Sequence, residues 1–541
     1  MPSTFFGLTI ASSGLNAAHV AINTTGHNIS NIETKGYSRQ QAIQQADDAL
    51  RAYSSYGMMG SGVVVTDIQQ IRDSYYDKKY WSNQCKLGEA SSKFYYMDQI
   101  QDQFYNELED VGFTPYYGNF ANALDELSHN PADGPTRNAA INAGQTFMEY
   151  FNNISTNLRT YQDEANLQIR TTVNRINTLS QNIASLNLQI ATLEMNGGMA
   201  NDLRDERNNS VDELSQLVGI TLDETVSPTG SSVYNIKIGN QELVSGTSYH
   251  TIELTTRDKK KFDTDVEDLY ELSWDNGLSF DVEDPSLSGA LRGYIDIRDG
   301  SNLVKPNYPE TAEGRVYKGI PYYEKQLNEF VKAYTEEFNK LQMKGVKGTA
   351  EGLDGTSTAD IPFFTIKDMT TDEIKQAIVD ANNADANNTD ITKDDVTSDQ
   401  IIEYISQNIT AGNACVNPDI IANNDLMATA TQVVDGVDGN DVILAMNDLR
   451  NQKIFKGRIA EDAIKSLVAV SSVNASAAKS AQTNFNNNSK SIINQRLMIS
   501  GVDKEEEGVD LVKFQRAYDL ASKVINVMNQ LYDKLINETG V

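Results

Sequence analysis

The chain has 541 residues and a formal net charge of -30, from 45 basic and 75 acidic side chains. A protein this acidic repels phosphate backbones and anionic lipid surfaces, so we expect no nucleic-acid partner. Hydrophobic residues make up 39% of the chain, and its length predicts about two to four domains. The two cysteines, Cys85 and Cys415, lie far apart without CxxC spacing, which argues against a disulfide framework and a zinc site.

The N-terminal segment has the spacing of an amphipathic helix. Its apolar positions recur in alternating steps of three and four residues, with Thr25 as one polar member. This repeat puts side chains on one stripe of a helix and is typical of a coiled-coil seam. The stripe consists of Leu8, Ala11, Leu15, Ala18, Ile22, Thr25, Ile29 and Ile32.

Signals for targeting are not found in the sequence. The first residues lack the basic start and the continuous apolar run of a cleavable export signal. No segment has the roughly 18 consecutive apolar residues of a membrane-spanning helix, so we expect no membrane insertion.

A long central helix is predicted from about residue 137 to 195. It would be roughly 90 Å long at about 1.5 Å per residue, which is the length of a rod. Gly197 and Gly198 are expected to end it, and a shorter helix follows through Leu217. Its heptad positions are Ile169, Thr172, Ile176, Leu179, Ile183, Leu186, Ile190 and Leu193.

The next part of the chain changes from helix to strand and back. Short alternating runs such as Tyr234, Ile236 and Ile238, separated by glycines, predict a small β-rich domain over 221–314. A helix is then predicted from about 321 to 343, with Leu327, Phe330, Val331, Tyr334 and Phe338 on one side.

Residues 346–450 carry 19 acidic and 5 basic side chains, a net charge of -14. We interpret this block as an acidic, solvent-facing inserted domain with a modest core. Its DGVDGND run, residues 435–441, is similar to a calcium-binding loop, but Val437 stands at a ligand position. We therefore favour an acidic turn and predict no metal site.

The C-terminal part is predicted to be helical from 451 to 500 and again from about Val509. The carboxylates of Glu505, Glu506 and Glu507 favour a helix N-terminus at this point. A second stripe with steps of three and four follows, made of Leu511, Phe514, Tyr518, Ala521, Ile525, Met528, Tyr532 and Leu535.

These elements predict a mainly α, multidomain protein with β-rich inserts, built as an elongated rod. The terminal helices, 1–45 and 505–541, would form a coiled-coil-like pair. Residues 46–220, 315–345 and 451–504 would form a discontinuous helical rod domain, from which 221–314 and 346–450 project. Because a terminal helix pair has little other protein to bury against, its apolar stripes would promote self-association.

No catalytic motif is found. The four histidines lack ligand spacing, and there is no Walker A loop, GxGxxG or GxSxG. Ser476 and Lys479 form an SxxK in an alanine- and serine-rich helix without a partner motif. We therefore expect no enzyme activity and no cofactor.

The segment SGLNAAHVAINTTGHNISNIETKGYSRQ, residues 13–40, resembles the N-terminal signature of flagellar rod, hook and hook-associated proteins. Its Gly36–Tyr37 turn resembles the hook-associated members, whereas rod and hook proteins more usually have Gly-Phe there. Residues 60–81, 124–147, 201–220 and 500–535 are similar to further segments of this family, in the same order.

The resemblance implies a structural subunit at the junction between hook and filament, outside the cell. Export by the flagellar type III pathway is implied, as is a ring of like subunits polymerised through the terminal helices. The implied partners are the hook protein, a second hook-associated junction protein, and an export chaperone at the C-terminal helix. The implied assembly residues are the stripe members Leu8, Leu15, Ala18, Ile22, Ile29, Ile32, Leu511, Phe514, Tyr518, Ala521, Ile525, Met528, Tyr532 and Leu535.

Three alternatives remain open at this level. One is another flagellar axial protein, such as the hook or distal rod protein. Another is an extracellular coiled-coil adhesin with the acidic block as its binding head. The third is an enzymatic outer domain, which a pocket with convergent His, Asp or Glu side chains in 220–450 would support, and the sequence shows none. Heptads alone are compatible with an adhesin, but the paired terminal signatures favour the flagellar family.

Overall fold

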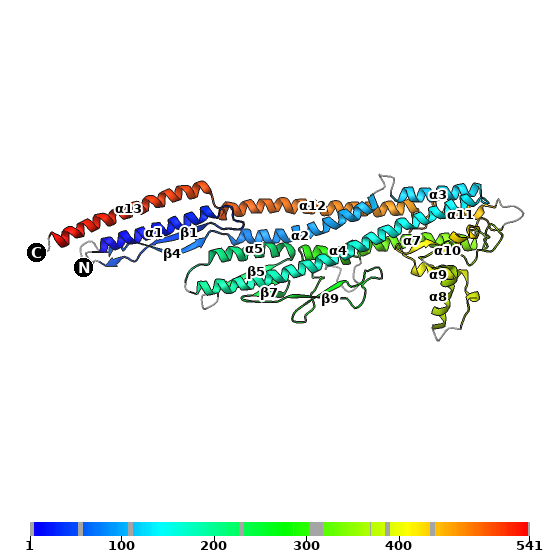
Figure 1. Ribbon diagram of the computed structural model, residues 1–541, viewed down its shortest axis with the longest axis horizontal. Helices are drawn as coiled ribbons and strands as arrows, with labels where there is room; N and C mark the ends of the chain where they lie inside the picture. Colours follow the sequence, from blue (N-terminus) through cyan, green and yellow to red (C-terminus); the bar gives the residue numbers. More distant parts are fainter. Residues whose placement is uncertain are drawn as a thin grey trace.

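The computed structural model describes residues 5–51, 58–105, 112–195, 197–226, 232–284, 286–302, 317–367, 369–384, 390–432 and 439–538. The molecule is an elongated rod, with both termini at one end (Figure 1). The helices are α1 Phe6–Ser30, α2 Ser74–Tyr105, α3 Phe113–His129, α4 Gly134–Glu194, α5 Asn201–Leu217, α6 Ala290–Asp299, α7 Ile320–Lys344, α8 Thr371–Ala384, α9 Ser398–Asn408, α10 Pro418–Ala422, α11 Asp441–Asp448, α12 Ala460–Ser500 and α13 Lys504–Asn537. The strands are β1 Gln40–Ala46, β2 Leu50–Arg51, β3 Met58–Met59, β4 Val63–Gln70, β5 Thr221–Val226, β6 Ser232–Ile238, β7 Gln241–Ser245, β8 Ser248–Tyr249, β9 Ile252–Thr256, β10 Tyr270–Trp274, β11 Phe364–Ile366 and β12 Ala414–Val416.

The mainly α, rod-like fold class is confirmed, and α4 is its longest helix with 61 residues. Asp133 caps its N-terminus by accepting a hydrogen bond from the backbone N–H of Thr136 at 3.1 Å. The predicted heptad positions from Ile169 to Ile190 are buried, whereas Leu193 is exposed near the end. Gly197, with φ +87°, follows the helix as expected.

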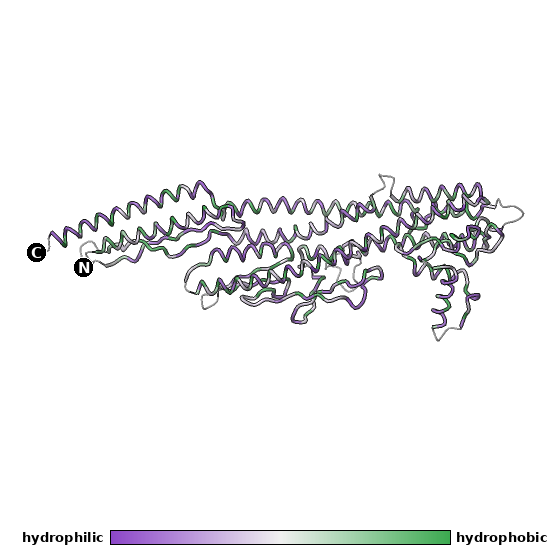
Figure 2. Tube along the Cα trace, in the orientation of Figure 1, coloured by the Kyte–Doolittle hydropathy of each residue, from purple (hydrophilic) through white to green (hydrophobic). Residues whose placement is uncertain are grey.

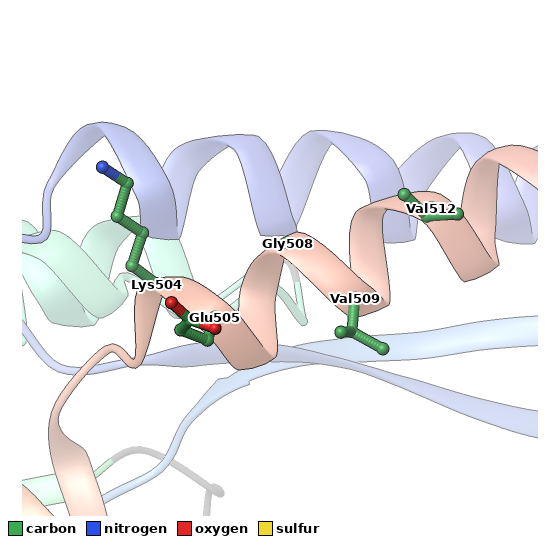
Figure 3. A pocket seen from close by; sticks show the side chains of 5 residues that line it. All are labelled: Lys504, Glu505, Gly508, Val509 and Val512. Atoms are coloured by element: carbon green, nitrogen blue, oxygen red, sulfur yellow. The ribbon is translucent and has the colours of Figure 1, made fainter.

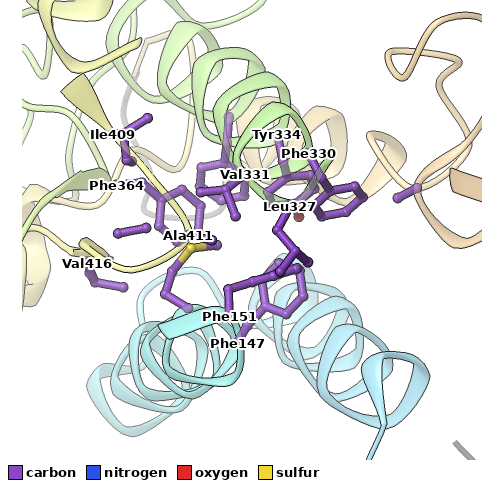
Figure 4. Close-up of a cluster of buried hydrophobic side chains, with 14 of the residues drawn as sticks. Phe147, Phe151, Leu327, Phe330, Val331, Tyr334, Phe364, Ile409, Ala411 and Val416 are labelled. Atoms are coloured by element: carbon purple, nitrogen blue, oxygen red, sulfur yellow. The ribbon is translucent and has the colours of Figure 1, made fainter. Parts of the chain in front are cut away.

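The end of the rod away from the termini contains a large core, here called the head core. Aromatic side chains from α4 and α7 fill its centre, among them Phe147, Phe151, Phe330 and Tyr334 (Figure 4). Phe330 stacks on Phe455 with ring centroids 4.4 Å apart. Each such ring contributes roughly 1.5–3 kcal/mol through the removal of its surface from water.

The structure differs from the prediction for 346–450, because this block shares the head core instead of forming a core of its own. Phe363, Phe364, Val416 and Met427 are buried in it. The guanidinium of Arg137 in α4, itself buried, donates to the backbone carbonyls of Asn424, Met427 and Pro131. The block also contributes buried apolar residues from α8, α9 and α11, so its core is larger than the modest one that was expected. Helices α8 and α9 extend to one side of the head (Figure 1), although their buried residues join its core. Residues 435–438 of the DGVDGND run lie outside the described part.

The predicted β-rich region contains two antiparallel sheets, one with strand order β5-β6-β7-β8 and the other pairing β9 with β10. They pack on the second half of α4 and on α5 through a core that includes Ile176, Val211, Ile236 and Trp274, here called the sheet core. The prediction of a β domain over 221–314 missed α6, whose buried Leu291 and Ile295 join the same core.

The terminal domain is larger than predicted. The antiparallel pair of β1 and β4 lies beside α1, so residues 46–51 and 58–70, which were predicted to be part of the helical rod domain, lie at this end instead. The last helix starts at Lys504, five residues before the expected Val509, because Asp503 caps it and the following carboxylates favour its first turn. Helix α12 lies along α2 and connects the head to this domain.

Candidate assembly interface

Helices α1 and α13 form an antiparallel pair at the free end of the rod (Figure 1). The ring of Phe5 lies 4.8 Å from that of Tyr532, and the ring of His19 lies 6.4 Å from that of Tyr518. A methyl group added at Gly7 would meet the Met528 side chain. The partner numbers fall along α13 as they rise along α1, as an antiparallel helix pair requires.

We call the contact between the two helices the seam, and the predicted residues Tyr518, Met528 and Tyr532 lie in it. Ala18 is buried, and Ile32 lies past the end of α1, where it is exposed. Leu535 is also exposed, so it does not belong to the seam. The other predicted residues are partly buried: Leu8, Leu15, Ile22, Ile29, Leu511, Phe514, Tyr518, Ala521, Ile525, Met528 and Tyr532.

A second apolar stripe on α13 was missed by the sequence analysis. Its members are between 48% and 69% exposed. Several of them precede a seam residue by one position, which turns this stripe about 100° around the helix from the seam. Apolar and polar residues alternate along α13 in Figure 2. We call this set the outward stripe: Val509, Val512, Leu520, Val524, Val527, Leu531, Leu535 and Ile536. Steps of three and four between Leu520 and Leu535 were the signal that could have revealed it.

The predicted Gly36–Tyr37 turn connects the helix pair to the strands. Gly36 has φ +80°, a conformation that favours glycine. The hydroxyl of Tyr37 donates to the side-chain oxygen of Asn28 at 2.8 Å, and burial raises the pKa of Tyr37. Glu507, 2% exposed, accepts from Asn28 at 3.1 Å and from Nε of Arg39 at 2.6 Å. Burial by itself would lower the pKa of Arg39, but the hydrogen bond and charge of Glu507 raise it.

A buried ionic network continues from this turn into the helical body. Asp205 of α5 accepts from the backbone N–H of Ser38 at 2.8 Å and from its hydroxyl at 2.7 Å. Arg72 lies 3.4 Å from Asp205 and 2.7 Å from Asp77, and Arg496 of α12 lies 2.8 Å from Asp77. Burial raises the pKa of Asp205, although the bonds from Ser38 and the charge of Arg72 act in the opposite direction. The network joins the terminal domain to α2, α5 and α12.

The two signature segments that were noted in the sequence, residues 36–40 and 201–209, therefore lie against each other. Gln40 donates to Asp202 at 2.8 Å, and Asn209 donates to the carbonyl of Lys35 at 3.2 Å. A methyl group on Gly36 would clash with the Asn209 side chain. This contact could not be read from either segment alone.

Lys479 of the SxxK lies over the ring of Phe94 at 5.9 Å. In the described ranges, no group of three or more His, Cys, Asp or Glu side chains is placed to hold a metal ion. Among the helices that the structure describes, none has both the length and the apolar composition to cross a membrane.

Comparisons with known proteins match most of the chain. Residues 97–364 match the model of the FlgK helical domain of flagellar hook-associated proteins. Residues 8–37 match the flagella basal body rod protein model, and residues 493–538 match the C-terminal model of flagellar basal body rod FlgEFG proteins.

Curated relatives align over nearly the full length. Flagellar hook-associated protein 1 of Bacillus subtilis is 28% identical over 100% of this chain and 99% of its own. Flagellar hook-associated protein 1 of Salmonella typhimurium is 25% identical over 97% and 98%. The solved flagellar hook junction protein FlgK of Burkholderia pseudomallei is 19% identical, with a TM-score of 0.42 over 53% of this chain and 46% of that one.

Proposed function

The chain belongs to the family of flagellar hook-associated proteins, and on this premise we propose how its terminal helices build the junction. It is a structural subunit of the bacterial flagellum at the junction between hook and filament. The full-length relatives are hook-associated proteins and not hook proteins, rod proteins or adhesins, which decides between the alternatives that the sequence left open.

In the proposed mechanism, the two stripes of α13 have different partners. The seam stripe holds α13 against α1 within one subunit. The outward stripe is buried against neighbouring subunits when they form a ring on the distal end of the hook. Burial at about 25 cal/mol per Å² of apolar surface makes this step favourable, by roughly 1 kcal/mol for each half-exposed Leu or Val. The observation that carries the proposal is the row of half-exposed apolar side chains from Val509 to Ile536.

The same mechanism assigns functions to the parts of the chain. Residues 5–51 and 58–70 together with 504–538 would be the assembly domain, and the remaining described residues would form the body. Subunits would be secreted through the flagellar type III channel, with an export chaperone covering the outward stripe until assembly. The hook protein would lie on one side of the ring and a second hook-associated junction protein on the other.

The test is Val527→Glu in the outward stripe, with Asn529→Glu as the control. Both substitutions add one negative charge within the same turn of α13, and both side chains are exposed. We expect Val527→Glu to remain monomeric and folded by far-UV circular dichroism, and to stop adding to isolated hooks in electron micrographs. Asn529→Glu should add as the unmodified chain does, since it lies on the other side of the helix. Normal addition of Val527→Glu would contradict the proposed interface.

A further inference from the structure

Exposed apolar side chains lie on both sides of the bend between α12 and α13, and we call this set the elbow patch. It consists of Leu497, Met498, Val509 and Val512, of which Met498 is 86% exposed. Val509 and Val512 project from the first turns of α13, beside Lys504 and Glu505 (Figure 3). Gly508 lies next to Val509 and has open space beside it, since a methyl group there would meet nothing within 4 Å. The patch also continues the outward stripe, which begins at Val509.

A second exposed patch lies at the turn between α4 and α5, and we call it the tip patch. It consists of Leu188, Leu193, Met195 and Met199, with exposed fractions from 43% to 82%. None of these four side chains contributes to the sheet core, whereas Leu186 and Ile190 on the same helix are buried. A cluster of exposed leucine and methionine is unusual on a monomer and marks a contact surface. Methionine suits such a surface because its flexible side chain adapts to a partner.

The two patches have a definite placement in the rod. The α4–α5 turn and the α12–α13 bend lie at about the same level along the long axis, on opposite sides of the molecule (Figure 1). The end of α1 and the strands β1 and β4 lie between them in this view, so the patches of one subunit do not cover each other.

From this placement we infer that the tip patch of one subunit packs against the elbow patch of a second copy. Subunits related by rotation about an axis parallel to the rod turn opposite sides toward their two neighbours. Two different patches at one level therefore meet in a heterologous contact, which is the kind that closes rings. The inference rests on the proposed function, because it requires subunits that stand side by side.

The test is cross-linking between engineered cysteines in rings assembled on isolated hooks. Chains with Met195→Cys and chains with Met498→Cys are mixed in a Cys415→Ser background, in which the remaining Cys85 is buried. A short bismaleimide is then added. The control replaces Met195→Cys by Leu167→Cys, which is on the same helix and 47% exposed but lies about 30 Å from Leu188.

We expect on the order of tenfold more dimer from the Met195 and Met498 mixture than from the control, because contact raises the local concentration of the two thiols. A chain that carries both cysteines should give a ladder of multimers. Each single-cysteine preparation alone should give no dimer.

Three results would overturn the inference while the proposed function stands: rings without cross-linking above the control, dimers from either single variant, or adducts with the hook protein. Failure of the unmodified chain to add to hooks would contradict the proposed function itself. Far-UV circular dichroism of each variant verifies the fold, which surface substitutions should leave unchanged.

Discussion

At the joint between the terminal helices and the body, each of the residues 38–40 donates a hydrogen bond to a different carboxylate. Ser38 donates a hydrogen bond to Asp205, Arg39 donates to Glu507, and Gln40 donates to Asp202. The sequence identified this segment as a family signature and predicted the glycine turn. It could not identify the partners, because they lie more than 150 residues away in the chain.

Gly36→Ala should destabilise this joint, with Gly26→Ala as the control. A residue with a Cβ at φ +80° costs roughly 1–2 kcal/mol, and the methyl group would also clash with Asn209. Gly26 lies within α1 with nothing near its added methyl group, so alanine there should stabilise by roughly 0.5–1 kcal/mol. Hydrogen exchange in α1 and α5, followed by mass spectrometry, should speed up only for Gly36→Ala. Equal exchange in both variants would show that the turn does not anchor the joint.

At the scale of the element, α13 shows that one helix can carry two apolar stripes with different surroundings. The heptad count found the partly buried stripe from Leu511 to Tyr532, of which Tyr518 and Met528 lie against α1. The outward stripe has nearly the same spacing, and several of its members stand one position before a residue of the predicted stripe. Periodicity alone cannot tell which of two neighbouring stripes faces inward, since both satisfy the same repeat.

Tyr518→Ala and Leu520→Ala should separate the two stripes in the free subunit. Tyr518 contacts His19, whereas Leu520 is 63% exposed. Loss of the partly buried ring should weaken the helix pair by roughly 1–3 kcal/mol, less than for a fully buried aromatic. We expect faster hydrogen exchange in α1 for Tyr518→Ala and unchanged exchange for Leu520→Ala. If both variants loosen α1, the outward stripe is also part of the seam.

At the scale of the whole molecule, the cores are separate from the assembly domain. Of the residues that the structure describes, none from α1, β1, β4 or α13 belongs to the head core or the sheet core. The buried network from Ser38 to Arg496 and the chain connections join the domain to the body. The body should therefore fold without the terminal helix pair.

A chain that ends at residue 503, and so lacks α13, tests this division. We expect the denaturant-induced unfolding of the body, followed by near-UV circular dichroism of the head-core aromatics, to keep its midpoint. Addition to isolated hooks should be lost, because both stripes of α13 are missing. A large fall in the midpoint would show that the terminal helices support the body, and capping of hooks by the shortened chain would refute the assembly mechanism.

The sequence by itself determined the long helix α4, the helical pair at the termini, the mainly α class and the flagellar family, because these depend on local periodicity and contiguous signatures. Only the tertiary structure decided that 346–450 shares the head core, that residues 46–51 and 58–70 belong to the terminal domain and that the two signatures meet at Asp205. Such facts depend on which surfaces become neighbours. The buried apolar residues of this block, such as Phe363 and Val416, share one core with Phe147 and Phe151 of α4, which are distant in the chain.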